Sequence, residues 1–357
     1  MEGFHLSSFG SRWLYRDLVG SKSLTSSSHH EAAWQWNFTL PLLRSVRSLA
    51  GVSVWFLLSW QLTSFAATHP LSIVTYNVEN YLLTSSGGRP AKSEEAKQKI
   101  VEVLHRLSPD VLALEEVGGR DALEDLRLRL ARSGSLYAQV ELAAGHDPFI
   151  SMALLSRLPI VGRRSQTNLS YVWMGRRFFV GRAFLEVDLQ TDKSVVTVMA
   201  AHLKSRRELL DADQAELREQ EARLLRRRVD RHLESNPQSR LVVLGDFNDT
   251  PDSKPIRGLI GRGASGLFDL RPTEKNLECG AVVSSAVGTG GGLKPIAWTH
   301  YYGREDTYSR VDYILASRAL HSLMDREGTF VAGFEGWGIA SDHRPVIARF
   351  RITVTAP

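Results

Sequence analysis

The stretch Leu244-Gly245-Asp246-Phe247-Asn248 ends an apolar run, residues 241–244, that is typical of a buried strand. It places a carboxylate and an amide in a turn beside apolar side chains, where a carboxylate is costly unless a cation offsets its charge. A second stretch, Ser341-Asp342-His343-Arg344-Pro345, places an acid and an imidazole before the apolar run 346–354. Because strand ends present side chains to a cleft, both stretches point to a polar site at the edge of a sheet.

Three other polar residues stand just after apolar runs: Asn77, Glu116 and His202. Each of them taken alone is compatible with a turn residue, a helix-start acid or a buried histidine satisfied by hydrogen bonds. Together with the pair Asp342-His343 they supply oxygen ligands and two histidines, which metal-assisted cleavage of a phosphate ester requires. The combination therefore indicates an enzyme.

From Leu71 onward, apolar runs typical of strands alternate with helical patterns. The predicted helices are 93–107, 121–132 and 208–233, and the predicted strands are 71–76, 110–114, 151–155, 178–189, 194–201, 241–244, 310–315 and 346–354. The Gly-rich segment 272–295 is expected to be a loop. No linker or internal repeat interrupts this body, so we expect one domain over residues 69–354.

Bulk composition sets wide limits on function. With 357 residues and 43% hydrophobic content the chain can bury a large core. The single cysteine, Cys279, excludes an intramolecular disulfide and a cysteine-based zinc site. The net charge is +5, of which +2 lies before residue 69. The remainder is weak as a nucleic-acid signature, so charge alone does not select the substrate.

The N-terminal region has the pattern of an export signal. Residues 1–43 show no sustained periodicity and are expected to be a disordered extension. Arg44 and Arg47 precede an uncharged apolar run, and Ser64-Phe65-Ala66 supplies small residues for cleavage near Ala66. Segment 44–67 is therefore expected to be a signal peptide, or alternatively a retained membrane anchor, because it just reaches spanning length. We expect an exported protein with no stable membrane association unless that segment is retained.

Seven motifs of the body occur in the order typical of one family. They are Thr75-Tyr76-Asn77, Leu114-Glu115-Glu116-Val117, Leu155-Ser156-Arg157-Leu158-Pro159-Ile160, Ala201-His202-Leu203-Lys204-Ser205, Leu244-Gly245-Asp246-Phe247-Asn248, Arg310-Val311-Asp312-Tyr313-Ile314 and Ser341-Asp342-His343. The body resembles the endonuclease/exonuclease/phosphatase superfamily, whose fold is called DNase I-like, over residues 71–352. The resemblance implies an α/β fold, a four-layer αββα sandwich of two packed mixed β-sheets flanked by helices.

The resemblance also implies a metal site that holds Mg²⁺ or Mn²⁺. Its expected ligands are Asn77, Glu116, Asp246 and Asp342. Where the family has Leu-Gln-Glu, this chain has a glutamate, Glu115, in place of the glutamine, so the aligned ligand is Glu116. Asp246 is expected to position water or to bind a second metal. Hard oxygen ligands of this kind suit both cations.

The remaining catalytic roles implied by the resemblance concern proton transfer and phosphate binding. His343, oriented by the neighbouring Asp342, would deprotonate or position the attacking water, and Asp312 is the carboxylate that family members use to support that histidine. Asn248 would hydrogen-bond a phosphoryl oxygen. His202 would stabilise the phosphate or protonate the leaving group. Hydrolysis is expected to proceed by in-line attack without a covalent enzyme intermediate.

Departures from the family pattern make two branches of the family less suitable for this chain. The apurinic-endonuclease branch usually has Tyr where His202 stands, and the segments 245–249 and 311–313 differ from those of the inositol-polyphosphate 5-phosphatases. The expected activity is that of an exported, metal-dependent, nuclease-like phosphodiesterase, with DNA or RNA as candidate substrates and a monomeric state. Alternatives are a sphingomyelinase-type or small-molecule phosphodiesterase or phosphatase and, more remotely, a catalytically inactive phosphate-binding module.

Two further patterns bear on the substrate. Five arginines between the central strands, with aromatic residues interleaved, form either a phosphate-tracking surface or solvated groups above a core: Arg163, Arg164, Arg176, Arg177 and Arg182. Lys204, Arg206 and Arg207 are expected to add positive charge near the cleft. The arginines of 208–233 are interpreted as the solvated side of a helix. No exposed hydrophobic hairpin for lipid docking is recognised, which favours nucleic acid.

Overall fold

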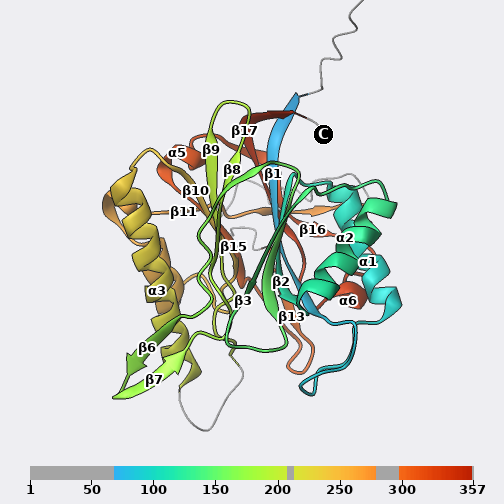
Figure 1. The fold of residues 1–357 in the computed structure, drawn as a ribbon, viewed down its shortest axis with the longest axis horizontal. Helices are drawn as coiled ribbons and strands as arrows, with labels where there is room; N and C mark the ends of the chain where they lie inside the picture. Colours follow the sequence, from blue (N-terminus) through green and yellow to red (C-terminus); the bar gives the residue numbers. More distant parts are fainter. Residues whose placement is uncertain (1–67, 207–212, 279–296, 356–357) are drawn as a thin grey trace, which may run out of the picture. The chain divides into compact units, whose positions relative to one another are not determined.

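Residues 68–206, 213–278 and 297–355 are described by the computed structural model. They form two large sheets that pack face to face, with helices on both outer faces (Figure 1). The predicted extension 1–43 and the predicted signal or anchor segment 44–67 lie outside the described residues. Within the described ranges, no helix has the length and apolar character needed to cross a membrane.

The first sheet, as far as the chain is described, has seven strands. Their order is β12 (Thr273–Asn276), β16 (Met324–Gly333), β17 (Val346–Thr355), β1 (Thr68–Tyr81), β2 (Val111–Val117), β4 (Ser151–Ser156) and β3 (Gln139–Ala144). The central pair β1 and β2 is parallel, and the flanking pairs of β1 with β17 and β2 with β4 are antiparallel. The ends of β1 and β2 therefore lie at the same edge of the sheet.

The second sheet has six strands within the described ranges. Their order is β11 (Phe268–Asp269), β15 (Asp312–Ala316), β10 (Arg240–Asp246), β9 (Val195–Ala200), β8 (Leu185–Gln190) and β5 (Ile160–Arg163). Strands β9 and β10 are parallel, whereas β10 and β15 are antiparallel. Two small hairpins stand beside the sheets: β6 (Ser170–Trp173) with β7 (Arg176–Phe179), and β13 (His300–Tyr302) with β14 (Thr307–Ser309).

Side chains along β1 point alternately to the two faces of the first sheet, and so contribute to two different cores. Leu71 and Ile73 lie in the core between the two sheets, together with residues of the second sheet such as Val242. Val74 and Tyr76 point the other way, into the core beneath the helices. Helices α1 (Glu94–Leu107), α2 (Arg120–Arg132) and α6 (Trp337–Ala340) lie on that side, and α3 (Gln214–Ser235) and α4 (Lys254–Ile260) cover the second sheet (Figure 1). The predicted four-layer αββα sandwich is confirmed.

Helix α3 carries the arginine-rich pattern of the sequence. It begins after the N-cap Asp213, whose side chain accepts from the Ala215 N–H; the predicted start at residue 208 lies outside the described residues. Arg223 pairs with Glu219 four residues earlier on the helix at 2.6 Å. Arg226 pairs with Asp230 and Arg228 with Glu186, but their side chains are only 12% and 16% exposed. Arg218 is 4% exposed and pairs with Asp249, so the solvated-face interpretation is wrong for these three arginines.

Some strands differ from the prediction. The predicted strand 178–189 is wrong, because residues 180–184 separate β7 from β8. Within the predicted loop 272–295, Thr273–Asn276 is strand β12, and residues 279–296 lie outside the described part. Neither the polar sequence of β12 nor the charged start of β16 shows apolar alternation. Their pairing comes from the neighbouring strand and not from local pattern.

The hairpin formed by β6 and β7 contradicts the expectation that no exposed hydrophobic hairpin is present. Val172 is 63% exposed, Met174 81% and Phe179 50%, so an exposed apolar hairpin is present after all. One of its faces is covered: Tyr171 packs on the core beneath α3, and the Trp173 Nε1–H donates to Glu216. Alternation places Val172 on the other face, where the Phe179 ring lies 4.1 Å from that of His146 and Val172 stays largely exposed among the described residues.

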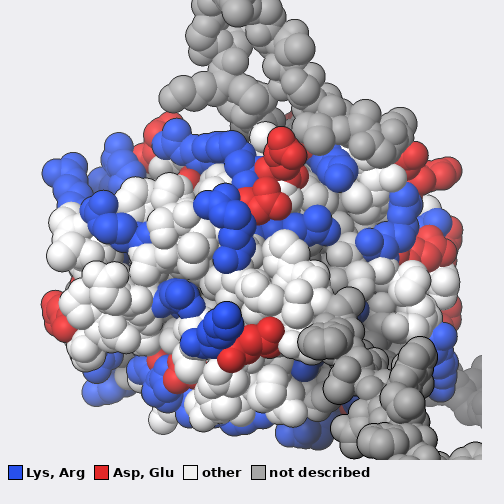
Figure 2. Space-filling model, turned by 90° about the horizontal axis from the view of Figure 1, so that it is seen from above, with Lys and Arg blue, Asp and Glu red and all other residues white. Residues whose placement is uncertain are grey.

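Charge on the surface is mixed. Figure 2 shows the molecule from above the view of Figure 1, and lysines and arginines lie there among aspartates and glutamates. Basic side chains are more widespread than acidic ones among the described residues of this face, and uncharged residues lie between them.

The backbone conformation of Gly245 leaves no room for a side chain. Its φ is +134°, and a Cβ at this position would lie 2.0 Å from the carbonyl oxygen of Ala201. We expect Gly245→Ala to lower the free energy of unfolding by about 3 kcal/mol or more. Gly258 in α4 is the control, because a Cβ there meets nothing within 4 Å. Gly258→Ala should raise stability by up to about 1 kcal/mol in urea denaturation; equal stability of the two variants would contradict this account.

Candidate active site

The two sheets bring the ends of their central strands together. In register, Asn77 of β1 stands opposite Glu115 of β2, and Asp246 of β10 stands opposite Asp312 of β15. The segment that carries His202 follows β9 and is held by the Leu203 N–H, which donates to the Asp246 carbonyl at 3.0 Å. Residues far apart in the sequence therefore meet at one edge of the sandwich.

Asp246 lies at the centre of this cluster. Its Oδ2 accepts from the Asn77 Nδ2 at 3.1 Å, although the two residues are 169 positions apart. The same Oδ2 lies 3.4 Å from His202 Nε2 and 3.7 Å from His343 Nε2. The Asn77 Nδ2 also reaches Glu116 Oε1 at 3.4 Å. Three of the four predicted metal ligands, Asn77, Glu116 and Asp246, are thus neighbours.

Burial makes negative charge on the side chains of this cluster energetically costly. Asp246 is only 1% exposed, and burial together with the nearby Asp312 raises its pKa to about 6, although the charge of His343 opposes this change. Negative charge at this site is therefore held at a cost that a cation would relieve.

The adjacent residues Glu115 and Glu116 are distinguished by the backbone. Glu116 has φ +66°, an uncommon value for this residue type, and the register of β2 shifts between Leu114 and Val117. Its Oε2 accepts from the Asn80 N–H at 3.0 Å. Glu115 is fully buried, accepts from the Thr75 hydroxyl at 2.8 Å, and has its pKa raised well above the usual range by burial and by Asp312.

A histidine–aspartate pair stands beside Asp246. His343 Nδ1 lies 2.9 Å from Asp312 Oδ2, and both side chains are buried. Burial opposes the charged ring, but the carboxylates of Asp312 and Asp246 outweigh it and raise the pKa of His343 well above its ordinary value. Asp312 therefore orients this ring. Asp342, expected from the sequence as the orienting acid, lies 3.9 Å from Nε2 instead.

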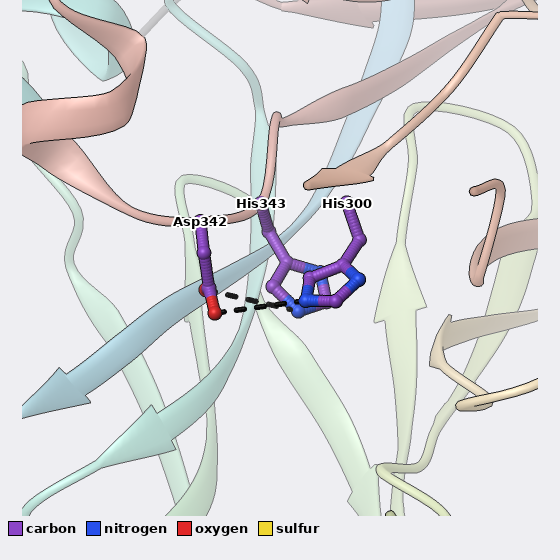
Figure 3. Close-up of side chains that lie close together, drawn as sticks. All are labelled: His300, Asp342 and His343. Atoms are coloured by element: carbon purple, nitrogen blue, oxygen red, sulfur yellow. Dashed lines mark ion pairs between the residues drawn. The ribbon is translucent and has the colours of Figure 1, made fainter. Parts of the chain in front are cut away.

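Asp342 faces a second histidine that the sequence analysis missed. Its Oδ2 lies 3.6 Å from His300 Nε2, and the rings of His300 and His343 are 4.5 Å apart between centroids (Figure 3). His300 belongs to β13, and an isolated bridge pairs it with His343. The only local signal was the polar-aromatic segment 299–302 that follows the Gly-rich stretch.

His202 is buried and contacts a cation. Arg182 Nη2 lies 2.8 Å from His202 Nε2. Because a guanidinium has only donors, Nε2 accepts and the imidazole is neutral. Burial, followed by the charge of Arg182, lowers the pKa of His202 well below its usual value, which agrees with a neutral ring.

Asn248 lies beside the same carboxylate. Its backbone N–H donates to Asp246 Oδ1 at 2.9 Å, and its Nδ2 donates to the Leu203 carbonyl at 3.1 Å. The residue has φ +53°, which asparagine tolerates better than most residues. All predicted site residues are therefore described and grouped at one end of the sandwich.

The five arginines of the sequence pattern do not form one surface. Arg163 pairs with Glu141, and Arg164 pairs with Glu186 and Asp188. Arg176 and Arg177 lie exposed on the hairpin of β6 and β7. Arg182 alone of the five contacts a site residue in the described structure. The single phosphate-tracking surface is thus not formed, because pairing with acids occupies two of its members.

The donor set fits a hard divalent cation. Glu116 and Asp246 offer carboxylate oxygens within one buried cluster, and the Asn77 Nδ2 donates to both of them. The Asn77 Oδ1 accepts from the Glu79 N–H at 2.9 Å, so the amide would have to turn over to offer its oxygen to a cation. Several buried polar atoms around it have no hydrogen-bond partner, among them Glu115 Oε2 and Asp312 Oδ1. The buried group Asp246, Asp312 and His343 has ligand atoms within 4.8 Å of one another. Concentrated acids with unpaired oxygens are the environment that a cation neutralises.

Solved structures share this fold at low identity. The catalytic domain of human Nocturnin with bound sulfate is 17% identical, with a TM-score of 0.56 over 82% of this chain and 98% of that one. An endonuclease/exonuclease/phosphatase protein from Bacteroides vulgatus is 15% identical, with a TM-score of 0.55 over 80% and 99%. Sphingomyelinase C from Streptomyces griseocarneus is 16% identical, with a TM-score of 0.51 over 79% and 99%.

Among curated protein sequences, none matches this chain significantly. The family profile does match, and its limits enclose the cluster, from β1 to the histidine that precedes β17. The matched residues are 74–343, which contain Asn77, Glu116, His202, Asp246 and His343. With the DNase I-like fold and this match, the chain belongs to the endonuclease/exonuclease/phosphatase family, whose members are hydrolases of phosphoester bonds.

Proposed function

We propose that this protein is a divalent-metal-dependent phosphodiesterase with nuclease-like chemistry. The observation that carries the proposal is the buried pair His343–Asp312, whose imidazole faces Asp246 across 3.7 Å. An imidazole held by one carboxylate and directed toward a second polar cluster is the arrangement that activates water. The nearby oxygen ligands Asn77 and Glu116 complete a site for a charged phosphoryl group.

Asn77, Glu116 and Asp246 would hold Mg²⁺ or Mn²⁺, with Asp342 as the fourth predicted ligand. When bound, the cation neutralises negative charge that builds on the phosphoryl oxygens. The fit rests on the hard oxygen donors and on the raised pKa of Asp246, about 6, which reports crowded and buried negative charge.

The side chains of the chain then have separate tasks. His343 accepts the proton of the attacking water, and Asp312 stabilises the ring that becomes charged. Asn248 would donate to a phosphoryl oxygen through the Nδ2 hydrogen that reaches Asp246 Oδ2 at 3.2 Å in this structure. His202 has no proton at Nε2 while Arg182 donates to it, which disfavours protonation of the leaving group from this atom and favours a role in orienting Arg182 beside the phosphate. Attack is in line, and no side-chain nucleophile takes part.

The substrate is proposed to be a phosphodiester, with DNA or RNA as the first candidates. A sphingomyelinase-type or small-ester activity is the second candidate, since the exposed hairpin of β6 and β7 offers Val172 and Met174 to an apolar surface. The protein is further proposed to be exported, to act as a monomer, and to remain off the membrane once segment 44–67 is removed. The N-terminal charge pattern and small residues near Ala66 support export.

Removal of the base is the first test. His343→Ala should lower kcat by about 10²- to 10⁴-fold on bis(p-nitrophenyl) phosphate, DNA or RNA with Mg²⁺ or Mn²⁺, because proton transfer from water loses its acceptor. His321→Ala is the control, since that ring stacks on Phe268 at 4.4 Å and belongs to α5 (Arg318–His321). Activity of His343→Ala within a few-fold of wild type would refute the assignment. Metal binding without turnover in the wild type would favour an inactive phosphate-binding module.

The two adjacent glutamates give a second test. Glu116→Gln should raise the Mg²⁺ concentration for half-maximal activity by about tenfold or more, because a charged ligand becomes neutral. Glu115→Gln is the matched control: the buried Glu115 has a raised pKa, and an amide also accepts from the Thr75 hydroxyl. The rate is measured as a function of Mg²⁺ concentration for both variants. The opposite ranking of the variants would show that Glu115 is the ligand.

Export is tested by the mature N-terminus. Protein recovered from the exported fraction of expressing cells should begin at Ala67 or Thr68, as read by N-terminal sequencing. Ala66→Trp should delay cleavage, because a bulky residue does not fit the small-residue site, and His69→Ala should not. Full-length protein confined to the membrane fraction would identify a retained anchor instead.

A further inference from the structure

A cavity of about 660 Å³ opens beside the catalytic cluster. Its walls include Arg89, Asp147, Phe149, Arg182 and Lys204. A smaller cavity of about 320 Å³ shares four of these residues, all but Phe149, and extends to Glu116. The hollow therefore runs from the predicted metal ligand outward over a lining that the catalytic steps above do not use, apart from Arg182.

This lining is dominated by cations. Arg89, Arg182 and Lys204 face a single carboxylate of the larger cavity, Asp147, which pairs with Arg89 at 3.1 Å. The other oxygen of Asp147 is already engaged, since it accepts from the Phe149 N–H at 2.9 Å. The acid therefore balances one of the three cations at most.

The environment of Arg182 is the strongest indication that this cavity is an anion-binding site. It is only 9% exposed, and its Nε has no hydrogen-bond partner in the described structure. One of its other nitrogens donates to a neutral imidazole, His202, which does not balance its charge. Nearby, burial and then the charge of Arg182 lower the pKa of Lys204, whereas the buried Glu221 opposes this change and interacts with both cations. Even with that acid nearby, a buried guanidinium whose Nε lacks a partner is costly unless an acceptor binds it.

We infer that this cavity binds a second phosphate group of the substrate, next to the phosphodiester that is cleaved. The inference rests on the proposed function and names the class of substrate for that site. Guanidinium and ammonium groups are the usual partners of phosphate oxygens, and Arg89 and Arg182 offer planar donor sets for them. Arg182 links the two positions, because it lines the cavity and contacts His202 of the catalytic cluster.

The chemistry of the lining separates the candidate substrates. A nucleic-acid strand, or a nucleotide with a terminal phosphate, brings a second anion close to the scissile one. A phosphocholine headgroup instead carries a quaternary ammonium, which Arg89, Arg182 and Lys204 would repel. The favoured substrate is therefore a phosphodiester that carries a neighbouring phosphate, and sphingomyelin is disfavoured.

The test compares thymidine dinucleotides that differ only in a terminal phosphate. The full-length protein with Mg²⁺ or Mn²⁺ is given the dinucleotide without a terminal phosphate, the 5′-phosphorylated form and the 3′-phosphorylated form. One phosphorylated form should be cleaved with kcat/KM about tenfold or more above that of the bare form, since charge-assisted hydrogen bonds to it are added. Sphingomyelin in mixed micelles should be cleaved more slowly than either.

Variants of the lining show whether the cavity is responsible. Arg89→Gln should remove most of that advantage and leave the bare dinucleotide unchanged, and Lys204→Gln should lower kcat/KM more for the phosphorylated form than for the bare form. Arg223→Gln is the matched control, because it removes the same charge from the exposed side of α3, where Arg223 pairs with Glu219. Equal loss on all substrates, or equal cleavage of all three dinucleotides by the wild type, would overturn the second-phosphate site.

Binding separates failure of the site from failure of the proposed function. Both phosphorylated dinucleotides are titrated into His343→Ala by calorimetry, and the one that binds more tightly should bind about tenfold more weakly when Arg89→Gln is added. If the wild type cleaves no phosphodiester but this difference persists, the cavity is confirmed and the catalytic proposal falls. If turnover is present and the added substitution changes neither binding nor kcat/KM, the cavity proposal falls alone.

Discussion

The carboxylate of Asp246 is the group on which the arrangement of this end of the molecule depends. It is almost fully buried, and the side chains around it come from both sheets: Asn77, Asn248, His202 and His343. A buried charge is tolerated only when hydrogen bonds and opposite charge surround it. The close packing of the two sheets at this edge is what allows one carboxylate to satisfy donors from both.

The same constraint links the catalytic cluster to its surroundings. His343 is held by Asp312 on the neighbouring strand, and His202 is held by Arg182, which lies just before β8. Each histidine thus has a partner of opposite character: an acid raises the pKa of one ring, while burial and a cation lower that of the other. Two imidazoles near one carboxylate are thereby given different proton affinities: His343 gains the higher affinity that a proton acceptor needs, and His202 stays neutral.

Local pattern was sufficient for much of the fold. The helix after Ser93 begins as predicted, because the Ser93 hydroxyl caps it by accepting from the Ala96 N–H. The runs of β1, β2 and β10 are apolar on both faces, as expected for strands buried on both sides. Strand β12 and the covered face of the β6–β7 hairpin were not recognised. Their stability comes from pairing with β16 and packing on α3, which a sequence window does not contain.

The sequence by itself determined the family, the layered fold and the set of polar residues at strand ends, because motif order and hydrophobic periodicity are properties of the chain. Only the tertiary structure decided which partner each residue has. Asp312, 31 positions from His343, holds its ring, while the adjacent Asp342 faces His300. Arg89 and Arg182 came to line one cavity in the same way. Such contacts depend on where strands that are distant in the sequence end in space. The number of residues between two side chains does not determine the distance between them in the folded protein.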